Sequence, residues 1–573
     1  MKQSFVKVTF ILFNILIISL SGCAGDLLNQ GNGPANEGGF PTPTLASLFQ
    51  SSRETKVSEL QADANTPTPM LTSTPETPTP EPFDLVVNVN VNRDVHPISP
   101  LIYGVSGAPV EILNDLRPTL NSWGGNPSTR YNWKLGNAWN AGRDWFYRNG
   151  NYGNPEGSAS DNFIKEAEAA GAEVRLAYPA LGWVAKDANN DTCSFRLADG
   201  SCGDANGASC LEPGLIANPN TANVSSDAAS IAEWMKHLFE EQNFKIRYLA
   251  FDNEPELWGY THYDVHPACT TYEEILSKYL EYTEAIHSVV PDANFAGPVT
   301  CCWDYYWNSM AGDEDKAKHD NQDFLPWFLD SVRKHDEEQG WRSLHALDIH
   351  YYPEGVYNDK VDDNTAALRL RSTGSLWDST YVDESRIAQP INLIPRMQQL
   401  IEDHYPGTQL GISEWNWGAD NTMNGALAIA DVLGIFGKVE LDYAAYWTYP
   451  TQDGPGYNAF KLYTNYDGNG SRFGDTSVWA DSSDREMVSS YAAIDSATGN
   501  LHLIMINKSP SDQLTARVNL DGYSPQPNAK LYGLDNAAQD HILEDALEDI
   551  SSSFNIPLPP YSITLLVLQP QTP

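Results

Sequence analysis

Short apolar runs alternate with amphipathic stretches through the middle of the chain. Eight apolar runs lie at residues 101–107, 119–125, 173–179, 246–252, 294–299, 344–350, 408–414 and 442–448. Stretches with helical periodicity lie between most of them, at residues 223–243, 272–289, 323–339, 385–404 and 423–437. Eight strands that alternate with helices predict an α/β fold, an eight-stranded β/α barrel over residues 99–470.

An open, doubly wound parallel sheet is the structural alternative to a barrel. The first apolar runs lack an obvious helix between them, so that part of the pattern fits a barrel less well. However, no glycine-rich phosphate turn follows any early strand, as it would in a nucleotide-binding doubly wound sheet. We therefore expect the barrel.

The pattern changes after about residue 470. The segments "LHLIMINKS", "LTARVNLDG", "AKLYGLD" and "YSITLLVLQ" are strand-like and are separated by turn residues. They predict a β-sandwich domain over residues 471–573, and we expect the alternating segment 83–98 to add a strand to it. A separate carbohydrate-binding module is the alternative. Because these strands carry no clear aromatic stripe, we expect a supporting domain.

The chain begins with "MKQSFVKVTFILFNILIISLSGC", in which two lysines precede an apolar stretch. This is the layout of a secretory signal over residues 1–23. Its end resembles a bacterial lipobox, in which Cys23 would carry the lipid. A transmembrane anchor or a plain signal is the alternative, but the run is short for a span, which needs about 20 residues. We expect an exported protein on the extracellular face, anchored to the cell membrane through Cys23.

A spacer follows the signal segment. Between Thr66 and Pro82, six of 17 residues are proline and six are threonine. Such a composition cannot bury a core and behaves as a semi-rigid linker. Residues 24–82 are therefore predicted to be a disordered spacer between the membrane and the folded domains.

Six cysteines remain after Cys23, at positions 193, 202, 210, 269, 301 and 302. An even number in an oxidising compartment allows three disulfides, whose pairing the sequence leaves open. We do not expect Cys301 and Cys302 to pair with each other, because a bridge between adjacent residues strains the peptide. No Cys-x-x-Cys or clustered histidine pattern indicates zinc.

The formal net charge of −40 at pH 7 limits the partners. Such a charge repels phosphate backbones and anionic lipid surfaces, so we expect no nucleic-acid partner and no membrane contact except the lipid anchor. Neutral ligands are not repelled. The 16 Trp and 28 Tyr residues exceed the usual needs of core packing, and the flat, CH-rich faces of sugars stack on such rings. We expect a monomer that binds a neutral polysaccharide.

Two glutamates end predicted barrel strands. Glu254 ends the fourth run and Glu414 ends the seventh, and catalytic residues of β/α barrels sit at these carboxyl ends. Two carboxyl groups on one face are what glycosidic bond cleavage needs, because one protonates the leaving oxygen and the other attacks C1 or activates water. We expect Glu254 to hold the resting proton and Glu414 to stay ionised.

Other residues near the strand ends are candidates for substrate binding. Asn253 can bind a sugar hydroxyl, and Asn126 and Arg130 could bind the sugar at the cleavage point or orient Glu414. For Arg130, a structural bridge between loops is an equal alternative. The remaining candidates are His350, Tyr352 and the rings of Trp145, Trp377, Trp417 and Trp447, each of which could instead belong to the core.

We expect no cofactor for this chemistry. The segment "DANND" at 187–191 has the spacing with which a calcium loop begins, but Thr192 occupies the sixth position, where the sharp turn needs glycine. We interpret the segment as a polar loop and leave a structural calcium ion open.

The segments "FDNEPELW" and "ISEWNWG" resemble the two catalytic segments of glycoside hydrolase family 44. So do "GGNPSTRYNW", "NAGRDW", "GWVAKD", "DIHYYPEG", "LWDSTYVDES" and "AYWTYP", in order along nearly the whole chain after about residue 85. The resemblance implies a barrel with a β-sandwich, a retaining mechanism and endo-acting cleavage of β-1,4-glucans, often xyloglucan. It also implies that Glu254 is the acid/base and Glu414 the nucleophile.

Two other functions remain open. One is another barrel glycosidase, such as a mannanase or a xylanase. The other is a glycan-binding surface lipoprotein without catalysis. The presence of both Glu254 and Glu414 argues against the second, because a pure binding protein has no need of a paired acid and nucleophile.

Overall fold

The computed structural model describes residues 82–154 and 157–571. The predicted signal segment and all but the last residue of the predicted spacer lie outside the described residues. Within the described part, no helix combines the length and the hydropathy that a membrane span requires.

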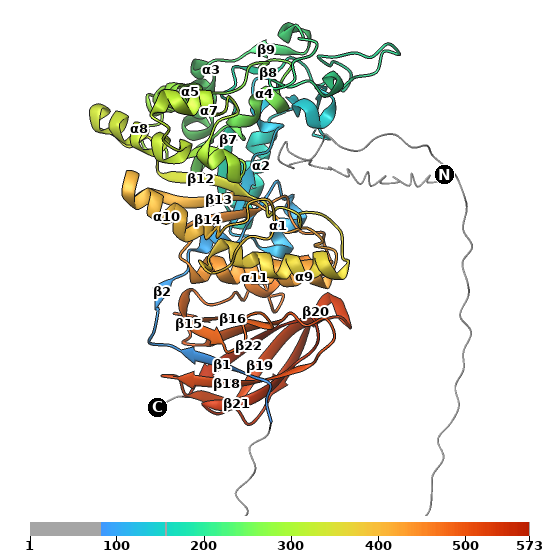
Figure 1. Cartoon of the computed structure of the whole chain (residues 1–573), viewed down its shortest axis with the longest axis vertical. Coiled ribbons are helices and arrows are strands. Elements are labelled where there is room, and N and C mark those ends of the chain that lie inside the picture. The colour runs from blue at the N-terminus through green and yellow to red at the C-terminus, as the bar shows by residue number, and fades with distance from the viewer. Residues whose placement is uncertain (1–81, 155–156, 572–573) are drawn as a thin grey trace, which may run out of the picture. The chain divides into compact units, whose positions relative to one another are not determined.

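Eight parallel strands form a closed barrel, as the pattern of apolar runs predicts (Figure 1). The predicted α/β barrel is confirmed, and one strand lies at each of the eight runs, with three strands ending one residue beyond the predicted run. The strands are β3 (Gly104–Ser106), β4 (Leu120–Trp123), β7 (Glu173–Tyr178), β10 (Tyr248–Phe251), β11 (Phe295–Thr300), β12 (Ala346–Tyr351), β13 (Gln409–Trp415) and β14 (Tyr443–Tyr446). Their middle positions are buried, so they read as continuous apolar runs rather than as alternating ones.

Two helices separate the first strands, although the sequence pattern did not reveal them. α1 (Val110–Leu116) has only seven residues, too few for a clear period. α2 (Ala159–Ala170) begins at Ser158, whose side chain accepts a hydrogen bond from a backbone N–H, and ends at Gly171 in the left-handed conformation. The other main helices are α3 (Ala228–Lys236), α5 (Tyr272–His287), α8 (Phe324–Gln339), α9 (Asp363–Arg371), α10 (Leu393–His404), α11 (Met423–Lys438) and α12 (Pro455–Thr464).

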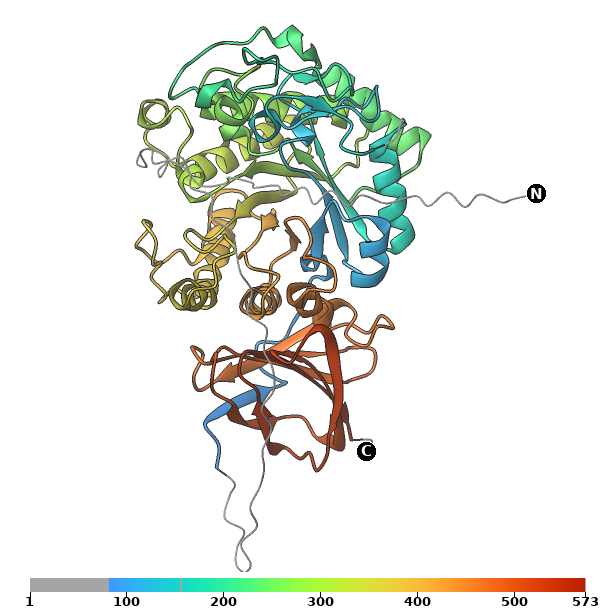
Figure 2. The same ribbon diagram turned by 90° about the vertical axis from the view of Figure 1, so that its right-hand side faces the viewer.

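A second sheet follows the barrel, and the start of the described chain belongs to it. β1 (Leu85–Asn90) pairs with β15 (Thr476–Ser482) on one side and with β18 (Leu514–Asp521) on the other, so the blue strand lies among orange and red ones in both views (Figure 1, Figure 2). Every second residue of β1 is buried, which matches its alternating sequence. The later strands are β15 (Thr476–Ser482), β16 (Val488–Ile494), β17 (Leu501–Asn507), β18 (Leu514–Asp521), β19 (Pro525–Asp535), β20 (Ala538–Leu547), β21 (Ser553–Leu558) and β22 (Ser562–Pro570).

Three disulfides join the six predicted cysteines as Cys193–Cys202, Cys210–Cys269 and Cys301–Cys302. The expectation that the two adjacent cysteines do not pair is wrong. That expectation considered only the strain that such a bridge puts on the peptide between the two cysteines. In the structure the bridge directly follows β11, where the Cys301 N–H is bound by a buried carboxylate described below.

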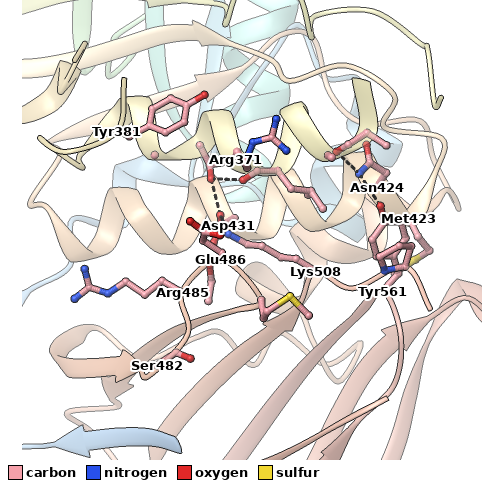
Figure 3. A pocket seen from close by; sticks show the side chains of 18 of the residues that line it. Arg371, Tyr381, Met423, Asn424, Asp431, Ser482, Arg485, Glu486, Lys508 and Tyr561 are labelled. Atoms are coloured by element: carbon pink, nitrogen blue, oxygen red, sulfur yellow. Dashed lines mark hydrogen bonds and ion pairs between the residues drawn. The ribbon is translucent and has the colours of Figure 1, made fainter. Parts of the chain in front are cut away.

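Helix α11 joins the barrel to the sheet through a buried ion pair. Asp431 accepts 2.7 Å hydrogen bonds from Thr373 and from Tyr491 on β16, and it lies 2.9 Å from the Lys508 ammonium (Figure 3). Burial opposes ionisation of Asp431, but Lys508 and the hydroxyl groups outweigh it and lower its pKa. Gly434 permits the close approach, since a β-carbon there would lie 2.3 Å from the Tyr491 ring.

Asp431→Asn should lower the free energy of unfolding by about 3–5 kcal/mol, because Lys508 would stay buried without its partner. The pKa of Asp431 is lower in the folded protein than in the unfolded chain. The stabilisation is therefore complete above the pKa of the unfolded chain, and it is lost as the pH falls through the pKa of the folded protein. Chemical denaturation at pH 7 measures the loss. The double variant Asp431→Asn/Lys508→Met, which removes both charges, should recover most of it. A single variant as stable as the parent would show that the ion pair contributes nothing.

Candidate active site

Glu254 lies three residues beyond the end of β10, on a strained turn. Its backbone is left-handed, with φ 43° and ψ 58°, and Pro255 follows it as the first residue of a short 3₁₀ helix. Such a conformation is unfavourable for a residue other than glycine, and it concentrates at functional sites. The Glu254 N–H donates to the Val299 carbonyl on β11 at 3.1 Å. The turn is therefore held to the neighbouring strand and directs the carboxyl group into the barrel mouth.

Glu414 reaches the same place from β13. It pairs in register with His350 on β12, beside an irregularity in the ladder. The His350 Nδ1 atom lies 3.0 Å from one oxygen of Glu254 and 3.4 Å from one oxygen of Glu414. One oxygen of each carboxyl group and a ring nitrogen of His350 all lie within 4.8 Å of one another. The Tyr352 hydroxyl donates a 2.8 Å hydrogen bond to Glu414. All four residues were predicted from the sequence.

A chain of amide groups begins beside Glu254. Asn253 donates a 3.0 Å hydrogen bond to Asn126, which in turn donates a 2.7 Å bond to Asp144. The two asparagines were predicted, and the structure brings them together beside Glu254. Asp144 was not singled out, although it lies within the quoted segment "NAGRDW". Burial raises the pKa of Asp144, and the charge of Glu254 adds to the effect.

Arg175 is a buried cation that the sequence analysis missed. It lies within the apolar strand β7 and pairs at 2.7 Å with Asp348 on β12. It also donates a 3.2 Å hydrogen bond to Ser122 on β4. Its positive charge lowers the pKa of Glu414. The available signal was an arginine in the middle of an otherwise apolar strand, where a charged residue requires a partner.

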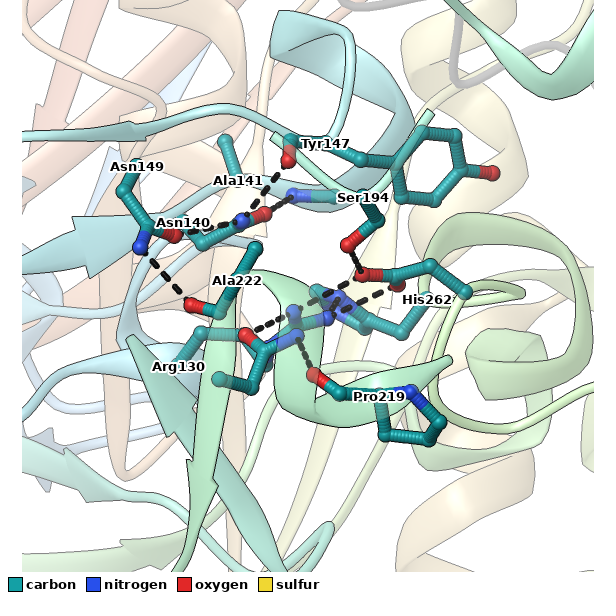
Figure 4. Close-up of polar contacts among 12 residues, drawn as sticks. Arg130, Asn140, Ala141, Tyr147, Asn149, Ser194, Pro219, Ala222 and His262 are labelled. Carbon is teal, nitrogen blue, oxygen red and sulfur yellow. Dashed lines mark hydrogen bonds and ion pairs between the residues drawn. The ribbon is translucent and has the colours of Figure 1, made fainter. Parts of the chain in front are cut away.

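Arg130 does not belong to the sugar site. Its side chain is fully buried, and it donates two 3.0 Å hydrogen bonds to Asp264 and another to Asn223 (Figure 4). Asp264 lies in the connection that follows β10, and Asn223 begins the short strand β9 (Asn223–Ser225) in the connection that follows β7. The expectation that Arg130 binds sugar or orients Glu414 is therefore wrong, and the alternative, a bridge between loops, is what the structure shows.

Two predicted stacking rings lie away from the carboxyl groups. Trp417 is fully buried and donates a 3.1 Å hydrogen bond to the Ser372 hydroxyl. Trp377 lies 4.2 Å beneath the Lys438 ammonium at the end of α11. Because the helices of a β/α barrel run back from the carboxyl ends of the strands, Lys438 lies at the end opposite Glu414. The fully buried Trp417 has no face open to a sugar, so the expectation that it binds substrate is wrong and the core alternative holds. Trp377 lies away from the carboxyl groups, and its role as a remote stacking platform stays a prediction.

The other two rings lie near the barrel mouth. Trp447 directly follows β14, and its ring packs so closely on Gly125 that a β-carbon there would lie 2.3 Å from it. Trp145 is 39% exposed, with the Arg148 guanidinium 4.7 Å over its ring. Both rings stay predicted stacking platforms.

The "DANND" loop forms hydrogen bonds within itself. The Asn189 side chain accepts hydrogen bonds from the backbone N–H groups of Asp191 and Thr192, at 2.9 and 2.8 Å. The structural calcium ion stays a prediction.

The sequence matches the model of glycoside hydrolase family 44 over residues 138–355. Endoglucanase A of Paenibacillus lautus is 32% identical over 530 residues, which cover 85% of this chain and 73% of that protein. The chain belongs to glycoside hydrolase family 44.

Solved structures agree with this assignment. CelM2, a bifunctional glucanase-xylanase from a metagenome library, is 37% identical with a TM-score of 0.80, over 85% of this chain and 99% of that one. A family 44 xyloglucanase from Paenibacillus polymyxa, solved with xyloglucan, is 28% identical with a TM-score of 0.74. The match covers 85% of this chain and 100% of that one. The resemblance seen in the sequence is confirmed, and the protein is a glycoside hydrolase.

In this family 44 enzyme, burial and neighbouring charges shift the pKa values of the groups around the carboxyl pair. Burial raises the pKa of Glu414 to about 7, with a contribution from the charge of Glu254, while His350, Tyr352 and Arg175 lower it. Burial lowers the pKa of His350, but the charges of both glutamates outweigh it and raise the value. We expected Glu414 to stay ionised; a pKa of about 7 leaves it only partly ionised at neutral pH.

Glu256 is a further buried acid that the sequence analysis did not assign. One of its oxygens accepts a hydrogen bond from the Cys301 N–H, and the other has no hydrogen-bond partner among the described residues. Burial raises the pKa of Glu256 to about 8, and the charge of Glu254 acts in the same direction. Glu256 is therefore mostly neutral at pH 7, so it adds no third full charge beside Glu254 and Glu414.

Tyr352→Phe should move the acid limb of kcat/KM to higher pH by about one unit. The Tyr352 hydrogen bond stabilises ionised Glu414, and a bond to a charged group is worth about 1.5–3 kcal/mol, against about 1.4 kcal/mol for one pKa unit. The measurement is a pH profile with a soluble substrate. The control is Tyr381→Phe, whose hydroxyl contacts Glu384 instead. An acid limb that stays in place, or moves to lower pH, would contradict the assigned role of Tyr352.

Proposed function

We propose that this enzyme is a retaining endo-β-1,4-glucanase that accepts xyloglucan, with Glu414 as nucleophile and Glu254 as acid/base. The observation that carries the proposal is the approach of the two carboxyl groups, whose nearest oxygens lie within 4.8 Å. Retaining glycosidases separate these groups by about 5–5.5 Å and inverting ones by roughly 6.5–9.5 Å, because inversion needs room for a water molecule.

The hydrogen bonds support this division of roles. Glu414 accepts a hydrogen bond from the Tyr352 hydroxyl and is attracted by buried Arg175, and both interactions favour its ionised form. Glu254 has no such hydroxyl donor among the described residues; its carboxyl group contacts the His350 ring instead. A nucleophile must be ionised to attack, whereas an acid/base must exchange its proton.

The reaction then proceeds in two steps. Ionised Glu414 attacks C1 of the sugar while Glu254 gives its proton to the departing glycosidic oxygen, which leaves a glycosyl ester on Glu414. Glu254, now a carboxylate, removes a proton from water, and the resulting hydroxide attacks C1 and releases Glu414. Glu254 ends protonated, as it began. His350 contacts both carboxyl groups and can compensate whichever one is charged.

The substrate class rests on the relatives. The proteins described above are called an endoglucanase, a xyloglucanase and a glucanase-xylanase. The high net negative charge favours a neutral polysaccharide. A xylanase is the second candidate, because the glucanase-xylanase is 37% identical to this chain. Rates on xyloglucan, carboxymethylcellulose and xylan separate these possibilities.

The mechanism predicts different behaviour for two amide variants. Glu414→Gln should abolish turnover of every substrate, because no glycosyl ester can form. Glu254→Gln should lower kcat on polysaccharide by roughly 10²–10⁴-fold, the usual contribution of general acid–base catalysis. On an aryl glycoside with a good leaving group, which needs little protonation, the first step should persist and the glycosyl ester should accumulate.

Azide should then restore turnover of Glu254→Gln and give a β-glycosyl azide, because this small anion needs no general base. Proton NMR of the product reads the configuration directly. An α-configured azide, or inversion during hydrolysis by the parent enzyme, would exclude the retaining mechanism.

We also propose that the chain is exported and held on the membrane by a lipid on Cys23, which lies outside the described residues. Cys23→Ser should move the protein from the membrane fraction to the soluble fraction. Its activity on soluble substrate should not change, because the predicted spacer separates the anchor from the barrel. A variant that is still retained on the membrane would contradict the lipobox.

A further inference from the structure

Asp252 is a fully buried acid two residues before Glu254. It follows β10 directly, and its backbone N–H donates a 3.1 Å hydrogen bond to the carbonyl of Tyr178, the last residue of β7. The sequence analysis did not single it out, although it lies within the quoted segment "FDNEPELW". Because the side chain is fully buried, it cannot touch a substrate, and any effect on the reaction must pass through its neighbours.

Four hydrogen-bond donors converge on the two oxygens of this carboxyl group. One oxygen accepts from the Thr129 hydroxyl at 2.5 Å and from the Asn253 N–H at 2.8 Å. The other accepts from the N–H groups of Ala180 and Leu181, at 2.6 and 3.0 Å. Burial raises the pKa of Asp252, and each of the four donors acts against that rise, as bonds to an ionised carboxyl group do. The surroundings of Asp252 are therefore built for a carboxylate.

The four donors belong to three different connections at the carboxyl ends of the barrel strands. One lies in the short 3₁₀ helix η2 (Ser128–Arg130) after β4, two follow β7, and the fourth belongs to the turn after β10 itself. Asp252 therefore ties the turn that carries Glu254 to the ends of β4 and β7. The Val299 carbonyl on β11 holds the same turn from the other side, through the Glu254 N–H.

This turn needs support, because its backbone is unfavourable on both sides of Asn253. Asp252 has φ 51° and Glu254 has φ 43°, both in the left-handed region. Residues other than glycine keep this conformation only where the surrounding structure fixes it. Without the Asp252 carboxyl group the turn is free to relax. Glu254 would then move relative to His350 and Glu414, which are held on other strands.

We propose that Asp252 is a positioning residue for Glu254, which holds the left-handed turn in the conformation that brings the acid/base carboxyl group to the glycosidic oxygen. This inference rests on the proposed function, because it takes Glu254 as the acid/base. A displacement of about 1 Å can cost on the order of 10²-fold in rate. Glu414 comes from a different strand, so its attack on C1 should depend much less on Asp252.

Asp252→Asn tests the proposal, because an amide keeps the shape of the side chain but satisfies at best three of the four donors. Its NH₂ group would face either the two N–H groups after β7 or the Asn253 N–H. The measurement is kcat/KM on two β-cellotriosides that differ only in the leaving group. The phenyl glycoside, whose leaving group needs a proton, should lose at least about tenfold. The dinitrophenyl glycoside needs little protonation and should change by less than about twofold.

Two further measurements make the test independent of how well this variant folds. Thr129→Val removes one of the four donors with almost the same shape, and it should show the same pattern with a smaller loss on the phenyl glycoside. Azide should raise the steady-state rate of Asp252→Asn on the dinitrophenyl glycoside. The reason is that a displaced Glu254 is also a poor base, so release of the glycosyl ester becomes limiting.

Asp336→Asn is the matched control. Asp336 on α8 is also buried, and it accepts hydrogen bonds from the N–H and hydroxyl groups of Ser343 and from the Tyr405 hydroxyl. Ser343 lies shortly before the amino end of β12, so this cluster is at the end of the barrel opposite the carboxyl pair. The variant should lose stability, but the ratio of its two kcat/KM values should stay that of the parent enzyme.

An equal loss on both glycosides in Asp252→Asn and in Thr129→Val, or no loss in either variant, would overturn the proposal. Glu254→Gln tests the proposed function separately. If that variant shows no dependence on the leaving group and no response to azide, the acid/base assignment itself fails. If it shows both effects while the Asp252 and Thr129 variants show neither, the assignment stands and the positioning role of Asp252 is refuted.

Discussion

Two carboxyl groups and an imidazole share a space that almost excludes water, and the barrel mouth is arranged around this constraint. Two like charges no more than 4.8 Å apart repel by at least about 3.5 kcal/mol at an effective dielectric constant of about 20, and burial opposes both charges further. A single negative charge in this space is therefore favoured over two. His350 between the carboxyl groups, Tyr352 on Glu414 and Arg175 inside the barrel make that single charge tolerable.

The fold was predictable because barrel strands are buried on both faces and so read as short apolar runs. One strand lies at each of the eight runs, and the carboxyl ends of the fourth and seventh place Glu254 and Glu414 together although 160 positions separate them. Helix α1 was not predicted, because its seven residues are too few to show the helical period of apolar positions. The vicinal disulfide was missed because local strain was weighed without the tertiary contacts that surround it.

Residue type was a good guide to which side chains lie at the site. It was a poorer guide to the direction in which aromatic and charged side chains point. Glu414 points into the barrel mouth, so its neighbour Trp415 on the same strand must point outward, and it packs against Phe436 of α11. That alternation was available from the sequence. The positions of Arg130 and Trp377 were not, because both depend on loops whose course no periodicity describes. Arg130 has an acidic partner 134 residues away, which only the folded chain brings near.

The C-terminal sheet has a physical reason to accompany this barrel. All residues of α11 from Met423 to Gly437 are buried, whereas a helix in the outer layer of a barrel normally leaves one face in water. Its sequence, rich in Ala, Leu and Ile, could not remain exposed on any side. The sheet covers the outer face, with Gly434 against Tyr491 and Asp431 bound to Lys508. Because α11 follows the strand that carries Glu414, the sheet supports the helix that comes directly after this carboxyl group in the barrel.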